Sequence, residues 1–334
     1  MVTGVRHGAE INLERIAAGQ RVIFMVPRNS GASGGVKTLY EHAQVLLRAG
    51  VDARLLARRE AYISADWGME VPVHIGNFQV QSGDVFVWPE VSRPSTIMRI
   101  NRPDVRNVLF VQNHFYVFQV LPDYSALARL RLSSIIASSK SIQKFLHRYL
   151  DLSNVPLIPC AIEHLCGNSI SKINQISLMP RKRVFEAAFI KKMLRRCFID
   201  AAKYEWLEID DMAHSQVMNN LARSKIFLSL QKMEGFGLPA LEAMAAGCLV
   251  VGFTGQGGAE YANSDNGIWV NEDDVEAAAG AVAKAVWLLR ERPDEAVAMI
   301  AAGRTTAARY SPAARDTAVL KVYGDILRER EPTD

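Results

Sequence analysis

Two glutamates, Glu234 and Glu242, stand eight positions apart and enclose the segment Gly-Phe-Gly-Leu-Pro-Ala-Leu. The segment follows a mostly apolar run, residues 225–230, which predicts a buried strand. Pro239 fits the first turn of a helix, where a backbone N–H has no partner in any case. Free N–H groups at a helix start attract phosphate, and carboxylates accept hydrogen bonds from hydroxyls. The spacing therefore favours a ligand that carries both phosphates and hydroxyls, such as a nucleotide sugar.

A second glycine-rich loop, Gly-Gln-Gly-Gly-Ala-Glu-Tyr at residues 255–261, follows the short apolar run 249–253. Glycine permits positive φ angles and a close approach of the backbone to a ligand. Gly257 and Gly258 are therefore candidate donor-binding residues. A tight turn between a strand and a helix is the alternative interpretation of this loop.

Three consecutive basic residues, Arg181, Lys182 and Arg183, follow the predicted strand 173–179. Ligands of open α/β sheets bind at the carboxyl ends of strands. Positive charge at such a place would stabilise a departing diphosphate. The alternative is a solvated start of the predicted basic helix 183–196, whose polar face would suit water or an anionic membrane surface.

Together these motifs resemble the donor-binding signature of retaining glycosyltransferases of the GT-B fold, specifically glycosyltransferase family 4, the "group 1" transferases. The resemblance implies that Glu234 holds the donor sugar and that Glu242 holds the ribose. It also implies that the loop between them lies against the donor through Gly235, Phe236, Gly237 and Leu238.

The resemblance further implies that Arg181 and Lys182 act on the departing diphosphate, without a metal ion and without any other cofactor. In that family several residues separate the arginine from the lysine, whereas here they are adjacent. Arg183 therefore stays open as a third candidate for contact with the diphosphate. No Asp-x-Asp motif of metal-dependent transferases occurs in the sequence.

The first half of the chain offers weaker candidates. His114 follows the predicted strand 107–112 and resembles the first-domain histidine that contacts the donor sugar in many members of the family, although a structural histidine is the alternative. Gly34 and Gly35, in a loop expected at residues 31–35, would let a phosphate approach the backbone. Glu90, after the apolar run 85–89, is a candidate on the acceptor side.

Two other classes of function compete with a transferase. Residues 31–38, Gly-Ala-Ser-Gly-Gly-Val-Lys-Thr, differ from a P-loop in one position, because Val36 stands where that pattern needs glycine. An ATP-dependent enzyme that uses this loop and Lys37 is one alternative. A protein that binds a nucleotide sugar without catalysis is the other.

Short apolar strands alternate with helices along the whole chain, which predicts two Rossmann-like doubly wound α/β domains facing each other across a cleft. We expect an acceptor-side domain at residues 1–163 and a nucleotide-sugar domain at 164–310. The remaining residues, 311–334, should form a helix that crosses back to the first domain, since Ser311 and Pro312 form an N-cap and N1 pair.

Composition limits the class of protein. The chain has 334 residues, of which 49% are hydrophobic and 22% charged, with a net charge of +4. That charge is too small to indicate nucleic acid as a partner. No apolar run reaches the ~18 residues of a membrane span and the first 20 residues lack a signal-peptide core, so we expect a cytoplasmic protein, with the inner membrane face as an added location.

The expected partners are a nucleotide sugar and a hydroxyl acceptor, which would be a glycan, a lipid-linked sugar or a small molecule. The four cysteines are scattered and are expected to be free thiols. The sequence thus predicts transfer of a hexose-type sugar with retention at the anomeric carbon. It does not indicate the nucleotide base, the acceptor or the oligomeric state.

Overall fold

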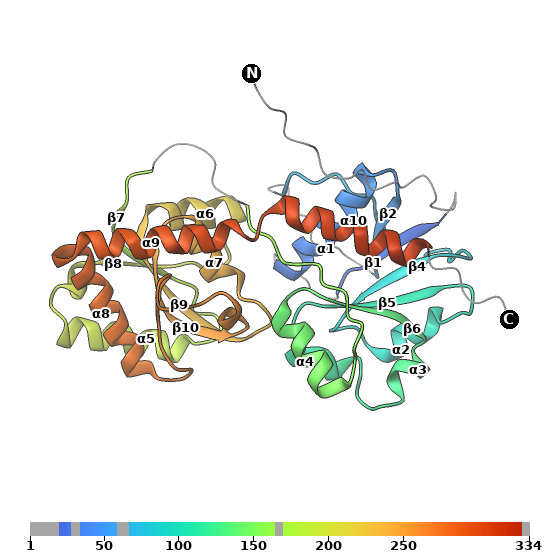
Figure 1. Ribbon diagram of the computed structural model, residues 1–334, viewed down its shortest axis with the longest axis horizontal. Coiled ribbons are helices and arrows are strands. Elements are labelled where there is room, and N and C mark those ends of the chain that lie inside the picture. The colour runs from blue at the N-terminus through green and yellow to red at the C-terminus, as the bar shows by residue number, and fades with distance from the viewer. Residues whose placement is uncertain (1–19, 28–33, 59–66, 164–169, 329–334) are drawn as a thin grey trace, which may run out of the picture.

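The computed structural model describes residues 20–27, 34–58, 67–163 and 170–328, which form two α/β domains lying side by side (Figure 1). The first domain contains a parallel sheet with the strand order β3-β2-β1-β4-β5-β6. Its strands are β1 (Arg21–Met25), β2 (Asp52–Ala57), β3 (Val73–Ile75), β4 (Val85–Pro89), β5 (Arg106–Val111) and β6 (Leu132–Ala137).

The second domain contains a parallel sheet with the order β11-β10-β9-β7-β8. Its strands are β7 (Ile173–Leu178), β8 (Glu205–Glu208), β9 (Ser224–Glu234), β10 (Leu249–Gln256) and β11 (Ile268–Trp269). The direction of strand addition reverses between β1 and β4 in the first sheet and between β7 and β9 in the second. Such switch points open a crevice at the carboxyl ends of the strands. The predicted pair of doubly wound domains is therefore confirmed.

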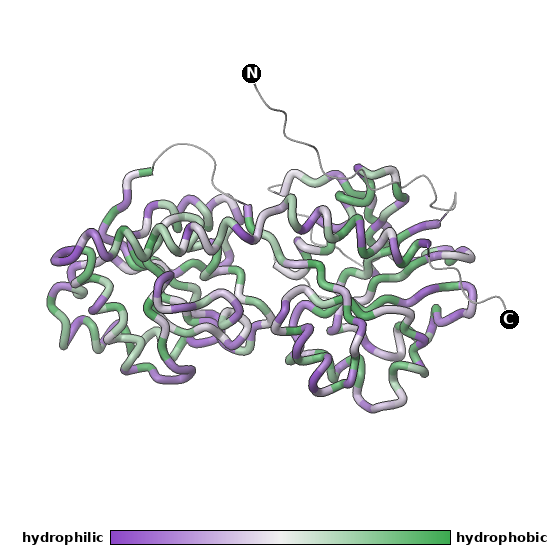
Figure 2. The backbone as a smooth tube through the Cα atoms, viewed as in Figure 1, coloured by the Kyte–Doolittle hydropathy of each residue, from purple (hydrophilic) through white to green (hydrophobic). Residues whose placement is uncertain are grey.

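Helices cover both faces of each sheet, so the central strands are buried and read as apolar runs. In the first domain α1 (Gly34–Arg48) packs on one face and α4 (Lys140–Leu150) on the other, next to the short helices α2 (Pro94–Ile97) and α3 (Ala126–Arg129). Figure 2 shows hydrophobic residues along the central strands and hydrophilic residues along much of the periphery.

In the second domain one face of the sheet carries α5 (Val184–Cys197) and α8 (Val275–Glu291). The other face carries α6 (His214–Arg223), α7 (Leu238–Ala245) and α9 (Pro293–Ala308). Within the described ranges, no helix has the length and hydropathy that a bilayer span requires.

The last helix, α10 (Pro312–Arg328), leaves the second domain after α9 and packs on the first (Figure 1). Val319 and Tyr323 join the core of the first domain, where the Tyr323 ring lies 5.5 Å from the ring of Phe24. The Arg315 guanidinium lies 2.8 Å from the Glu41 carboxylate on α1. The C-terminal segment thus ties the two domains together.

Several boundaries differ from those expected from the sequence. Helix α1 begins at Gly34, so Gly34 and Gly35 belong to its first turn and not to the preceding loop. Residues 31–33 of the P-loop-like segment, and residues 164–169 at the expected domain boundary, lie outside the described residues. Strand β9 runs on to Glu234 because it pairs with β10 as far as Gln256.

Candidate active site between the two domains

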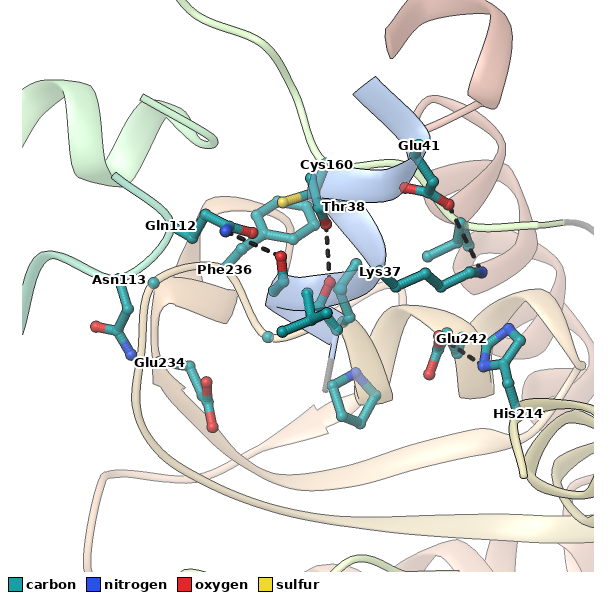
Figure 3. A pocket seen from close by; sticks show the side chains of 18 of the residues that line it. Lys37, Thr38, Glu41, Gln112, Asn113, Cys160, His214, Glu234, Phe236 and Glu242 are labelled. Carbon is teal, nitrogen blue, oxygen red and sulfur yellow. Dashed lines mark hydrogen bonds and ion pairs between the residues drawn. The ribbon is translucent and has the colours of Figure 1, made fainter. Parts of the chain in front are cut away.

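A cavity of about 670 Å³ lies between the two domains, at the carboxyl ends of both sheets. Figure 3 shows side chains from both domains pointing into it. The predicted site residues that line the cavity are Gly34, Gly35, Glu90, Arg181, Glu234, Gly235, Phe236, Gly237, Leu238 and Glu242. The predicted residues that lie outside the lining are His114, Lys182, Arg183, Gly257 and Gly258.

The glycine at the start of α7 is fixed in a left-handed conformation. Gly237 has φ of 92°, and a Cβ atom there would lie 2.2 Å from the Gln231 side-chain oxygen. Its carbonyl oxygen accepts hydrogen bonds from the Gln231 amide at 2.9 Å and from the Tyr261 hydroxyl at 2.6 Å. Glycine is therefore required here, and the turn presents the first residues of α7 to the cavity.

Glu242, in the second turn of α7, is a half-buried carboxylate on the cavity wall, with its side chain 15% exposed (Figure 3). Burial raises its pKa to about 7, opposed by the positive charge of Lys37 and reinforced by the carboxylates of Glu163 and Glu41. The Nδ1 atom of His214 lies 4.0 Å from the Glu242 Oε1 atom. A carboxylate held this way gains from a hydroxyl donor, since such a donor replaces lost water.

Lys182 forms an ion pair with the other glutamate. Its Nζ atom lies 2.6 Å from Glu234 Oε1 and donates a second hydrogen bond to the Lys232 carbonyl oxygen at 2.9 Å. The Lys182 side chain is 26% exposed and that of Glu234 is 28% exposed. Lys182 thus acts on the cavity through Glu234, whose orientation it holds.

The structure separates Arg181 from Arg183. Arg181 is exposed and lines the cavity. The Arg183 side chain is only 1% exposed, and its guanidinium lies 2.9 Å from Glu272, 2.5 Å from Asp273 and 4.2 Å from the centre of the Phe253 ring. Arg183 therefore packs in the second domain, and of the two arginines Arg181 is the one placed to meet a ligand.

The second glycine loop supports the first from behind. A Cβ atom on Gly257 would lie 2.4 Å from the Glu234 carbonyl oxygen and 2.5 Å from the Phe236 nitrogen. A Cβ atom on Gly258 would lie 3.1 Å from the Tyr261 hydroxyl. The missing side chains let the two loops pack backbone against backbone, which fixes the position of Glu234.

His114 lies beside the cavity wall and not on it. Its ring is 9% exposed and packs at 4.1 Å from the Phe115 ring and 4.6 Å from the Phe145 ring, measured between centroids. Burial lowers its pKa. Its Nδ1 atom finds no hydrogen-bond partner among the described residues. The residues just before it, Gln112 and Asn113, line the cavity instead.

Asn113 also joins the two domains, because its side-chain amide donates to the Met233 carbonyl oxygen at 3.0 Å. The Gln112 side chain donates to the Gly35 carbonyl oxygen at 3.0 Å, within the first domain. Sequence reasoning selected the histidine of this triplet because its chemistry is more distinctive. The signal that identifies its neighbours is their place directly after β5.

Lys37 lines the cavity but is committed to carboxylates. Its Nζ atom lies 2.9 Å from Glu163. It also lies 3.6 Å from Glu41, as Figure 3 shows. In a P-loop this lysine would have to reach a phosphate. Other lining residues that sequence reasoning missed are Trp67, Tyr116, Cys160, Glu163 and His214, which come from four separate parts of the chain.

Comparison with known proteins agrees with this geometry. Residues 209–305 match the family "Glycosyl transferases group 1". An alpha-1,6-glucosyltransferase of Actinobacillus pleuropneumoniae serotype 7 (strain AP76) is 24% identical over 270 residues, covering 77% of this chain and 81% of that protein.

Solved structures share the whole architecture. Sucrose-phosphate synthase from Thermosynechococcus elongatus superposes with a TM-score of 0.65 at 13% identity, over 92% of this chain and 99% of that one. The pneumococcal O-GlcNAc transferase in complex with UDP and GlcNAc gives 0.70 at 10% identity, over 93% and 99%. The chain therefore has the GT-B fold, and its residues 209–305 are similar to the group 1 glycosyltransferases.

Proposed function

We propose that this protein transfers a sugar from a nucleoside diphosphate sugar to a hydroxyl acceptor. The observation that carries the proposal is the placement of Glu234, Glu242 and the start of α7 on one cavity, which Arg181 also borders. The glucosyltransferase relative supports a hexose as the transferred sugar. The family 4 resemblance supports retention at the anomeric carbon and a mechanism without metal.

In our proposal the donor lies in one orientation on the second-domain wall of the cavity. Its diphosphate faces the start of α7 and Arg181, where a helix N-terminus and a cation both favour negative charge. Its ribose hydroxyls donate to Glu242, and the hydroxyls of the transferred sugar donate to Glu234. Lys182, 2.6 Å from Glu234, holds that carboxylate in place.

The reaction breaks the bond between the anomeric carbon and the diphosphate oxygen, and the electron pair leaves with the diphosphate. Positive charge that develops on the sugar is that of an oxocarbenium-like transition state. The acceptor oxygen then bonds to the anomeric carbon, and its proton passes to the departing diphosphate. Arg181 stabilises the growing negative charge of the leaving group.

The first test is a thermal-shift panel with UDP, GDP, dTDP, ADP and ATP, each with Mg²⁺ and with EDTA. A ligand at about 100 times its dissociation constant stabilises the folded state by roughly 2.7 kcal/mol. We expect one nucleoside diphosphate to raise the melting temperature in EDTA. A shift from ATP with Mg²⁺ alone would refute the proposal and favour an enzyme that uses residues 31–38.

The second test measures release of the nucleoside diphosphate from the matching sugar donor. A transferase releases it slowly in water and faster with a suitable acceptor. Binding of the donor without any release would instead identify a nucleotide-sugar-binding protein. Glu242→Ala, which removes the proposed ribose contact, should weaken donor binding, while Glu70→Ala, on the exposed surface, should not.

A further inference from the structure

Glu90 is a buried carboxylate on the opposite wall of the cavity. It follows β4, lines the cavity and is 5% exposed. Its Oε2 atom accepts a hydrogen bond from the Gln112 backbone N–H at 3.2 Å. None of the ion pairs found among the described residues includes Glu90. A carboxylate can accept about four hydrogen bonds, so Glu90, which has no cation partner there, can still accept hydrogen bonds from a ligand.

The rest of the first-domain wall distinguishes neutral from anionic ligands. Within the described part of that wall the one basic lining side chain is Lys37, which Glu163 and Glu41 hold. Among the described residues, that wall therefore offers an anion three carboxylates, Glu41, Glu90 and Glu163, and no uncommitted cation. Arg181, by contrast, lies on the second-domain wall, where the diphosphate is proposed to bind.

Two aromatic side chains complete the first-domain wall. Trp67 and Tyr116 both line the cavity and are partly exposed. The Trp67 ring packs against the ring of Tyr40, with 5.4 Å between centroids, which limits its rotation. Aromatic faces next to a few fixed polar groups are typical of sites that bind small polar ligands with apolar patches, as sugar rings have.

We propose that the acceptor is a neutral sugar or the end of a neutral glycan, and that the Glu90 carboxylate accepts a hydrogen bond from one of its hydroxyls. This inference rests on the proposed transferase function. Burial raises the pKa of Glu90 to about 7, with the backbone N–H of Gln112 opposing that rise. A hydroxyl donor from the acceptor would add to the stabilisation that this amide supplies.

The test compares acceptors and variants with the donor that the nucleotide panel identifies. The probes are glucose, galactose and maltose against glucose 6-phosphate, galactose 6-phosphate and sn-glycerol 3-phosphate. We expect the neutral sugars to have at least tenfold higher kcat/KM. Glu90→Gln should raise the KM for the sugar acceptor at least tenfold, because the amide replaces one carboxylate oxygen, which accepts hydrogen bonds, by an NH2 group, which donates them. Its donor dissociation constant and its rate of donor hydrolysis without acceptor should change less than twofold.

The control is Glu70→Gln, which makes the same chemical change at an exposed position outside the cavity. If Glu90→Gln fails to fold, Tyr116→Ala provides the second variant and should raise the acceptor KM alone. An unchanged acceptor KM in Glu90→Gln, a preference for the phosphorylated acceptors, or no transfer to any neutral sugar would overturn the inference. Donor hydrolysis without acceptor would still proceed in those cases, whereas failure of the proposed function would abolish it.

Discussion

Gly235 is the point at which the segment between Glu234 and Glu242 touches the first domain. The Gly235→Ala variant therefore tests whether this contact is kept during turnover. A Cβ atom on Gly235 would lie 2.1 Å from the Gln112 carbonyl oxygen and 2.8 Å from the Asn113 Cα atom. The backbone of Gly235 is not left-handed, since Gly235 is absent from the residues with positive φ. The substitution therefore strains the contact between the domains and not the loop itself.

The size of the effect follows from the hydrogen bonds at this contact. The Asn113 amide donates to the Met233 carbonyl oxygen at 3.0 Å, and the Ser139 hydroxyl donates to the Gly235 carbonyl oxygen at 2.9 Å. Relieving the overlap requires a separation of about 1 Å, which lengthens both bonds beyond their useful range. At about 1 kcal/mol for each hydrogen bond, the loss is about 2 kcal/mol. This equals roughly a 30-fold fall in the population of molecules in which the two domains keep this contact.

The assay is steady-state kinetics with donor and acceptor, together with a melting curve. We expect kcat/KM to fall about 30-fold while the melting temperature changes little, because neither hydrophobic core is altered. The matched control is Gly280→Ala on α8, where a Cβ atom meets nothing within 4 Å. It should leave kcat/KM unchanged and stabilise the helix by up to about 1 kcal/mol. A Gly235→Ala enzyme with kcat/KM within threefold of wild type would refute the reasoning.

Three further predictions concern single side chains. Glu242 has a pKa raised from 4.5 to about 7, so protonation stabilises the folded state fully below pH 4.5 and this contribution disappears as the pH rises through 7. Glutamine cannot ionise, so the free energy of unfolding of Glu242→Gln, relative to that of wild type, should be up to about 3 kcal/mol higher at pH 8 than at pH 4. Urea unfolding at the two pH values measures this difference. Arg183→Met should reduce the free energy of unfolding by only about 2 kcal/mol, because the carboxylate partners of Arg183 can be hydrated. It should change nucleotide affinity less than threefold, because Arg183 does not line the cavity. Arg181→Ala should lower kcat at least tenfold with a smaller change in donor affinity, and unchanged turnover would exclude its role.

The fold followed from local patterns of the sequence. Strands β1 and β4 read as continuous apolar runs because helices bury both of their faces. Helix α9 escaped prediction, since alanine makes up much of its length and both faces look alike. Strand β11 has only two residues, too few for any periodicity.

Residues 234–242 could be singled out as a candidate donor-binding segment because they are contiguous in sequence, and the structure places residues 234–239 and Glu242 on the cavity wall. The choice among Arg181, Lys182 and Arg183 could not, because three equal charges in a row give no periodic signal. Where α5 begins at Val184, the backbone turns and successive side chains point in different directions. Arg181 then reaches the cavity, Lys182 pairs with Glu234, and Arg183 is buried in the second domain.

The position of the Glu234 carboxylate, which we propose to bind the donor sugar, depends on both domains. Met233, just before Glu234, has φ of 51°, a left-handed conformation that costs a side-chain-bearing residue about 1 kcal/mol or more. Its carbonyl oxygen accepts hydrogen bonds from Asn113 of the first domain at 3.0 Å and from Lys182 at 3.4 Å. Opening the domains removes the first of these bonds and weakens the hold on the strained residue. The same interdomain contact therefore also fixes Glu234, so that the position of the proposed donor-binding carboxylate depends on the arrangement of the first-domain wall.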